Sequence, residues 1–310
     1  MGFLHLLEGI RTPIVSEFMS LITYCGDEIF FMALAITVFW CIDKCGGYYI
    51  LLVGFLGTVG NQFLKLWFRI PRPWVLDPGF TIVESARAAA TGYSFPSGHT
   101  QNIVGTMTCI SLMTKRKGVR ITAIALMLLV PFSRMYLGCH TPLDVAVSFL
   151  LALALAFALR PVMLKGEQNP RLLWGLLLLS VLVVMLYWAF VTFYSFPVDV
   201  DVDNLNSGTK NAYTLLGCLI GLMIAKALDD RYIHFQVKAS WWAQVLKVVL
   251  GLVFVVAIRA GLKAPLQAIM PEFQATTVRY CFMVVFAGAV WPLTFPWFAG
   301  LGKKAGPSDV

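Results

Sequence analysis

The stretch SRMYLGCHTPLD, residues 133–144, joins two apolar runs that are each long enough to cross a bilayer. The runs lie near 120–139 and 142–161. Apolar segments of about 17 to 25 residues, separated by short polar loops, are typical of membrane helices. The stretch therefore predicts two membrane helices that meet at one face, with the polar side chains of the stretch at the turn.

The rest of the chain continues this pattern. Hydrophobic residues make up 59% of its 310 residues and charged residues only 13%, whereas a soluble domain carries about a quarter charged residues. This composition predicts an all-α polytopic membrane helical bundle of about nine spans. Residues 14–25 are expected to form an interfacial helix instead. We expect the spans near 28–43, 46–68, 95–114, 120–139, 142–161, 172–195, 211–228, 242–262 and 279–300.

The net charge is +8, and its distribution favours a membrane topology over binding to nucleic acid. Basic residues gather in alternate loops such as 115–120 and 160–171, which the positive-inside rule places in the cytoplasm. The other loops are poorer in cations and include the acidic stretch 199–203. We therefore expect the N-terminus outside, the C-terminus in the cytoplasm, and stretch 133–144 at the extracytoplasmic or lumenal face.

The start of the chain and its cysteines indicate whether a cleaved secretory signal, disulfides or a metal site is expected. Met1 to Arg11 lacks the charge order and cleavage site of a secretory signal, so the first apolar segments are expected to remain. The seven cysteines are scattered, odd in number and mostly within spans. They are expected to be small packing residues rather than disulfides or metal ligands.

A lysine and an arginine mark the second expected span and the loop after it. Lys65 falls near the outer end of the span, where an ionisable residue indicates function, with snorkelling to the interface as the alternative. Arg72 follows between Pro71 and Pro73, which fix the backbone. A guanidinium group held in this way can donate hydrogen bonds to two phosphate oxygens at once. The long loop 69–94 is expected to be a lid.

The stretch FPSGHT, residues 95–100, lies where this loop meets the third expected span. Pro96 is suited to the first turn of a helix, and Gly98 lets the backbone approach a ligand closely. Free N–H groups at a helix start bind phosphate. Together with Ser97 and His99, this helix start predicts an anion site.

The stretch quoted first carries the third motif, S-R-x5-H-x3-D. Thr141 is a plausible N-cap and Pro142 a plausible first helical residue. Residues four apart on a helix share a face, so Asp144 can reach back to His140. A carboxylate that accepts the Nδ1 proton leaves Nε2 bare and more nucleophilic. Arg134, at the end of the preceding span, adds a third cation.

Three cations, two histidines and one orienting carboxylate at one predicted membrane face can form a phosphate-ester site that needs no metal or other cofactor. On these three motifs, Lys65 to Asp144, the sequence resembles the type 2 phosphatidic acid phosphatase superfamily. That superfamily includes lipid phosphate phosphatases, glucose-6-phosphatase, bacterial acid phosphatases and vanadium haloperoxidases. The runs 69–73 and 133–140 look closest to its membrane-bound members, including sphingoid-base phosphate phosphatases.

The resemblance implies a role for each motif residue. His140 is implied to be the nucleophile that becomes phosphohistidine, and Asp144 to orient it. His99 is implied to protonate the departing alkoxide and then to activate water. The phosphoryl oxygens are implied to be held by Lys65, Arg72, Arg134, Ser97 and the amide of Gly98.

We expect two regions along the chain. Residues 1–161 are predicted to form a phosphatase catalytic core, with the interfacial helix and the first five spans, and residues 162–310 an additional four-span membrane region. The expected function is hydrolysis of a lipid phosphate monoester or pyrophosphate, with membrane lipid as substrate and no obligatory protein partner. A water-soluble ester, as for glucose-6-phosphatase, and a lipid-handling or transport role stay open, since the motifs touch only phosphate.

The run DVDVDN, residues 199–204, resembles the start of a calcium loop but fails its requirement. Its sixth position is Asn204 rather than glycine, and its twelfth is Lys210 rather than glutamate. We expect a solvated outer loop.

Overall fold

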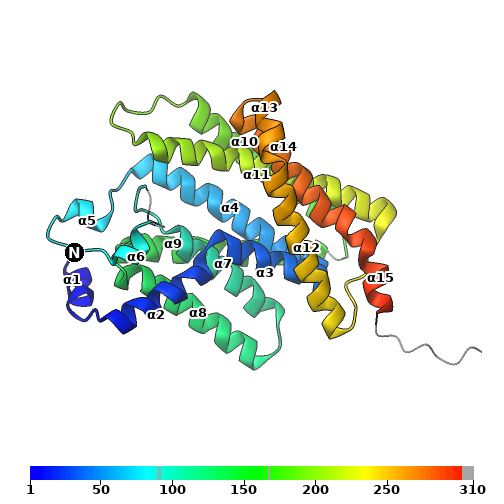
Figure 1. Cartoon of the computed structure of the whole chain (residues 1–310), viewed down its shortest axis with the longest axis horizontal. Helices are drawn as coiled ribbons and strands as arrows, with labels where there is room; N and C mark the ends of the chain where they lie inside the picture. Colours follow the sequence, from blue (N-terminus) through cyan, green and yellow to red (C-terminus); the bar gives the residue numbers. More distant parts are fainter. Residues whose placement is uncertain (89, 91, 167, 302–310) are drawn as a thin grey trace, which may run out of the picture. The chain divides into compact units, whose positions relative to one another are not determined.

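The computed structural model describes residues 1–88, 90, 92–166 and 168–301, and every regular element in these ranges is a helix (Figure 1). This confirms the predicted all-α class. The chain divides into two compact units. The first comprises Met1–Ala35 and Tyr49–Ala212, and the second comprises Ile36–Tyr48 and Tyr213–Val310.

Three of the longer helices run from one unit into the other: α3 (Glu28–Cys41), α4 (Lys44–Phe68) and α11 (Val202–Leu228). The first unit also holds α1 (Gly2–Gly9), α2 (Pro13–Thr23), η1 (Tyr24–Gly26), α5 (Pro73–Leu76), α6 (Glu84–Arg87), α7 (Gly98–Met113), α8 (Lys117–Tyr136), α9 (Pro142–Gly166) and α10 (Pro170–Phe193). The second holds η2 (Asp229–Ile233), α12 (Trp241–Gly261), α13 (Lys263–Ile269), α14 (Glu272–Val285), η3 (Phe286–Val290), η4 (Trp291–Thr294) and α15 (Phe295–Gly300).

Among the described residues, seven helices are long and apolar enough to cross a membrane, or up to eight if one bent pair is a single span. About nine were expected, and the difference has two sources. The expected span 95–114 forms α7, which has only 16 residues. The expected interfacial helix 14–25 and the expected first span form the bent pair, Pro13–Gly26 and Glu28–Cys41, with an angle of 50°.

The short helix α7 is enclosed by its neighbours, because it packs against both α8 and α9. Its residues Ile103, Val104 and Met107 form a buried cluster with Val130 of α8 and Ala152 of α9. A helix that is surrounded by protein does not need a lipid-length apolar surface. Burial in the bundle therefore allows a helix of only 16 residues at this place.

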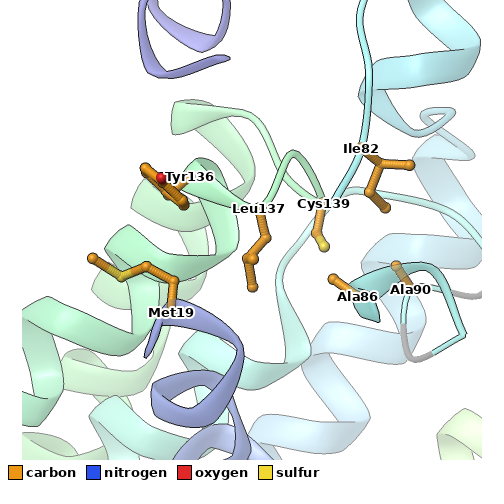
Figure 2. Close-up of a cluster of buried hydrophobic side chains, with 7 residues drawn as sticks. All are labelled: Met19, Ile82, Ala86, Ala90, Tyr136, Leu137 and Cys139. Atoms are coloured by element: carbon orange, nitrogen blue, oxygen red, sulfur yellow. The ribbon is translucent and has the colours of Figure 1, made fainter. Parts of the chain in front are cut away.

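Figure 2 shows how the loop after α5 is fixed beside the end of α8. The backbone N–H of Val83 donates to the carbonyl oxygen of Leu137 at 3.0 Å. The packing places Cys139, the residue before His140, against this loop. The buried cluster consists of Met19, Ile82, Ala86, Ala90, Tyr136, Leu137 and Cys139.

The second unit holds a buried lysine, Lys247, whose ammonium group contacts backbone carbonyl groups and an aromatic ring. Lys247 Nζ donates to the carbonyl oxygens of Trp40 at 2.8 Å and Val237 at 3.2 Å. The ammonium group also lies 4.2 Å from the centre of the Phe295 ring. These contacts give Lys247 a structural role.

Candidate active site

All eight residues predicted for the site belong to the first unit and lie at helix ends or in the turns beside them. Lys65 is in the last turn of α4, and Arg72 is the N-cap of α5. Arg134 is in the last turn of α8. The remaining residues lie at the starts of α7 (Ser97, Gly98, His99) and of α9 (His140, Asp144).

The imidazole of His140 is held on both of its nitrogens and is 2% exposed. Arg72 Nη1 lies 3.0 Å from His140 Nε2. A guanidinium group can only donate, so Nε2 accepts and the ring proton sits on Nδ1. Nδ1 lies 3.5 Å from Asp144 Oδ2 and 3.5 Å from Ser94 Oγ. The spacing of His140 and Asp144 predicts the same tautomer but a bare Nε2, whereas here Nε2 is in contact with Arg72.

Asp144 is fixed by the start of α9. Its Oδ2 accepts from the backbone N–H of Thr141 at 2.8 Å, while Thr141 Oγ1 accepts from the backbone N–H of Asp144 at 3.3 Å. This reciprocal capping confirms Thr141 as the N-cap and Pro142 as the first helical residue. Ser94 Oγ also donates to Asp144 Oδ2. No sequence motif pointed to Ser94, because it lies before the P-S-G-H run.

The surroundings of His140 keep its ring neutral. Burial lowers the pKa of His140 well below its ordinary value of 6.5, and the charges of Arg72, Arg134 and Lys65 lower this pKa further. An imidazole that is neutral at neutral pH, with its proton on Nδ1, has its lone pair at Nε2, which here accepts from Arg72. A neutral ring of this tautomer can act as a nucleophile.

Backbone carbonyl groups position two of the three cations, Arg72 and Lys65. Arg72 donates from Nε to the carbonyl oxygen of Gly92 at 2.8 Å and from Nη1 to that of Cys139 at 2.9 Å. Lys65 Nζ donates to the carbonyl oxygen of Tyr93 at 2.6 Å. The backbone N–H of His140 donates to the carbonyl oxygen of Arg134 at 3.3 Å.

Arg134 is 1% exposed, and its Nη1 donates to Thr23 Oγ1 at 3.0 Å. Its Nε is buried and has no hydrogen-bond partner within the described residues. Buried cations are costly unless an opposite charge compensates them. The excess of cations over the buried carboxylate Asp144 therefore suits a bound anion.

The start of α7 differs from the expectation in one respect. The helix begins at Gly98 with Ser97 as its N-cap, so Pro96 precedes the helix instead of lying in its first turn. Ser97 Oγ accepts from the backbone N–H of Thr100 at 3.4 Å, because the side chain is used as a cap. In the part of the chain that the structure describes, no atom apart from the chain neighbours and the helix's own backbone lies within 4 Å of the place where a Cβ on Gly98 would be, so the helix start faces open space.

His99 has a partner that the sequence did not suggest. Its Nε2 lies 2.7 Å from Oδ1 of Asp27, which follows η1 at the bend before α3. The two residues are 72 positions apart and share no motif. No spacing rule could have paired them.

The run 199–204 also takes part in the site, and this was not expected. Asn204 Oδ1 accepts from the backbone N–H of Tyr93 at 3.0 Å, and Tyr93 Oη accepts from the backbone N–H of Asp201 at 3.0 Å. Gly92 has a φ of +69°, and a Cβ there would lie 2.0 Å from Asn204 Oδ1. The carbonyl groups that bind Arg72 and Lys65 are thus held in place by the start of α11.

Comparisons with known proteins show the family of this chain. The profile of the PAP2 superfamily matches residues 46–168, and that of the PAP2 superfamily phosphatase transmembrane extension matches residues 213–304. Phosphatidylglycerophosphatase B of Bacillus subtilis (strain 168) is 32% identical over 164 residues, covering 49% of this chain and 76% of that protein. No solved structure matches the chain.

Two further relatives are matched over about half of their own length. A probable sphingosine-1-phosphate phosphatase of Dictyostelium discoideum is 25% identical over 249 residues, which is 74% of this chain and 56% of that protein. The undecaprenyl-diphosphatase BcrC of B. subtilis (strain 168) is 30% identical over 106 residues, which is 34% of this chain and 52% of that protein. Both profiles match this chain, and the three motifs lie together at one set of helix ends. The chain therefore belongs to the PAP2 superfamily and is a multi-pass membrane phosphoric ester hydrolase.

Proposed function

We propose that this protein hydrolyses the phosphate of a membrane lipid through a phosphohistidine at His140. The observation that carries the proposal is the set of contacts on the two ring nitrogens, with Arg72 at Nε2 and Asp144 and Ser94 at Nδ1. This arrangement supports a neutral, oriented nucleophile beside a cation. Phosphoryl transfer depends mainly on such positioning and on charge stabilisation.

In the proposed first step, His140 Nε2 forms a bond to phosphorus while the bond from phosphorus to the lipid oxygen breaks. His99 gives a proton to the departing oxygen, so the alcohol leaves neutral. In the second step His99 takes a proton from water as the water oxygen attacks phosphohistidine. Inorganic phosphate leaves and His140 is restored. Asp144 stabilises the positive charge on His140 in the phosphoenzyme.

The lipid part of the proposal is supported by the relatives and by the fold. The three relatives are named for phosphatidylglycerophosphate, sphingosine 1-phosphate and undecaprenyl diphosphate. The site residues lie at the ends of apolar helices, where a headgroup would sit while its chain remains in the bilayer. The cation-poor loops around the site support an extracytoplasmic or lumenal active site with a cytoplasmic C-terminus.

The proposed substrate class predicts a strong dependence on chain length. In detergent micelles, kcat/KM is expected to be highest for a long-chain lipid phosphate, lower for a short-chain analogue and lowest for glucose 6-phosphate. The apolar chain keeps the substrate at the membrane surface and supplies proximity. Phosphate release from the three esters at equal concentration is the measurement. A higher kcat/KM for glucose 6-phosphate would replace the lipid proposal with the water-soluble alternative.

The proposed mechanism also predicts activity without a divalent ion. Lys65, Arg72 and Arg134 supply the positive charge that a metal would otherwise bring to the phosphoryl oxygens. Turnover is expected to be nearly unchanged after dialysis against a chelator. Vanadate, which mimics the transition state of phosphoryl transfer, is expected to inhibit the enzyme. Loss of activity in chelator that added magnesium restores would contradict the proposal.

A further inference from the structure

The chain bends between α2 and α3 (Figure 1), and a carboxylate at this bend lies beside His99. Asp27 Oδ1 lies 2.7 Å from His99 Nε2, with the two side chains 35% and 17% exposed. Asp27 belongs to none of the three motifs and precedes the segment 46–168 that matches the PAP2 profile. Its contact is with a residue to which the proposed mechanism gives two proton transfers.

The backbone around Asp27 is closely fitted to the start of α7. A Cβ on Gly26 would lie 2.9 Å from His99 Cβ and 3.0 Å from the carbonyl oxygen of His99. Asn102 Nδ2 donates to the carbonyl oxygen of Gly26 at 3.2 Å. The backbone N–H of Asp27 donates to the carbonyl oxygen of Tyr24 at 3.1 Å, and the carbonyl oxygen of Asp27 accepts from Phe31 at the start of α3. The carboxylate is therefore held at the ring by the bend itself.

The chemistry of this contact assigns the two nitrogens of His99. Nε2 and Oδ1 lie 2.7 Å apart as an ion pair, although the angle of the contact is not that of a hydrogen bond and Nε2 has no hydrogen-bond partner among the described residues. Because a carboxylate only accepts, this proximity favours a proton on Nε2 and leaves Nδ1 for proton transfer. Burial lowers the pKa of His99, and the charges of Arg134 of α8 and Arg72 of the loop lower this pKa further. A carboxylate at hydrogen-bond distance favours the protonated ring. Asp27 thus offsets the two arginines at the residue that must donate a proton.

We propose that Asp27 is the positioning residue of His99, fixing Nε2–H and stabilising the imidazolium form, so that Nδ1 delivers the proton to the leaving oxygen and later receives one from water. Asp27 itself keeps its negative charge throughout. The inference rests on the proposed function, in which His99 is the proton donor.

The test compares a poor and a good leaving group. For an alkyl phosphate, kcat/KM of Asp27→Asn is expected to fall by about 10²-fold, within the range of general acid catalysis. For p-nitrophenyl phosphate, whose leaving group needs no proton, kcat/KM is expected to stay close to that of the wild type. In Asp27→Asn, the alkaline limb of the pH profile of kcat/KM for the alkyl phosphate should move to lower pH. Asp27→Glu should recover part of the lost kcat/KM. Glu17→Gln, at an exposed carboxylate of α2, is the matched control.

The variant His99→Gln separates this inference from the proposed function. In one outcome, His99→Gln lowers kcat/KM for the alkyl phosphate alone, but Asp27→Asn lowers kcat/KM for both esters equally. The role of Asp27 is then overturned and the mechanism stands. If His99→Gln lowers kcat/KM for both esters equally, the proton-donor role of His99 itself fails. Asp27→Ser serves as a second carboxylate-free variant should Asp27→Asn not give folded protein.

Discussion

Turnover is expected to fall by about 10⁶-fold in His140→Ala, the scale seen when a hydrolase loses its nucleophile. The ring is held by Arg72 on one side and by Asp144 and Ser94 on the other, and alanine leaves no atom to attack phosphorus. The measurement is phosphate release by purified protein, together with acid-quenched and base-quenched trapping of labelled phosphoenzyme. Phosphohistidine survives base and is lost in acid, so the wild type should show only base-stable label.

The matched control for this variant is another histidine. His234 is exposed, belongs to the second unit and has a φ of +48°. Asparagine tolerates that left-handed conformation, so His234→Asn should keep both fold and activity. Wild-type rates of phosphate release from His140→Ala would end the phosphohistidine proposal.

Arg72→Lys is expected to lower kcat/KM by about 10²- to 10³-fold, the cost of removing one preorganised donor from an active site. The guanidinium group reaches Gly92, Cys139 and His140 at the same time. A lysine keeps the charge but cannot reproduce the planar fork. Inhibition by vanadate should weaken in parallel, because the same group is proposed to hold phosphoryl oxygens.

The neighbouring Arg69 offers the control, since its Nη1 makes a local contact and donates to the carbonyl oxygen of Leu66 at 3.2 Å. Arg69→Lys makes the same chemical change outside the site and should leave kcat/KM close to that of the wild type. Equal losses in the two variants would mean that loop stability, and not the fork at His140, explains the effect.

The pairing of His140 with Asp144 was predictable because the two residues lie within one local motif. His140 and Asp144 are four positions apart, and the N-cap chemistry of Thr141 could be read from the sequence. Asp27 and Asn204 were not predictable. Each reaches the site from a distant segment, and long-range contacts leave no spacing pattern in a single sequence.

Hydropathy predicted where most helices lie but not which of them face lipid. The helices α8, α9 and α10 expose large apolar side chains, such as Leu128, Leu150 and Leu182, as membrane helices do. In α7, Gln101 and Thr106 are buried instead. Packing between α8 and α9, which a hydropathy pattern does not describe, determines the character of this helix.

The contact of Asn204 with the backbone at Gly92 and Tyr93 has a consequence for truncation and domain exchange. Cutting the chain at residue 168, where the match to the PAP2 profile ends, would remove the side chain that braces the carbonyl groups bound to Arg72 and Lys65. A truncation that keeps this brace must extend beyond residue 168 and include the start of α11, which belongs to the first unit up to Ala212. A chimera that swaps the following helices should join beyond that residue, so that the donor sequence replaces none of the brace.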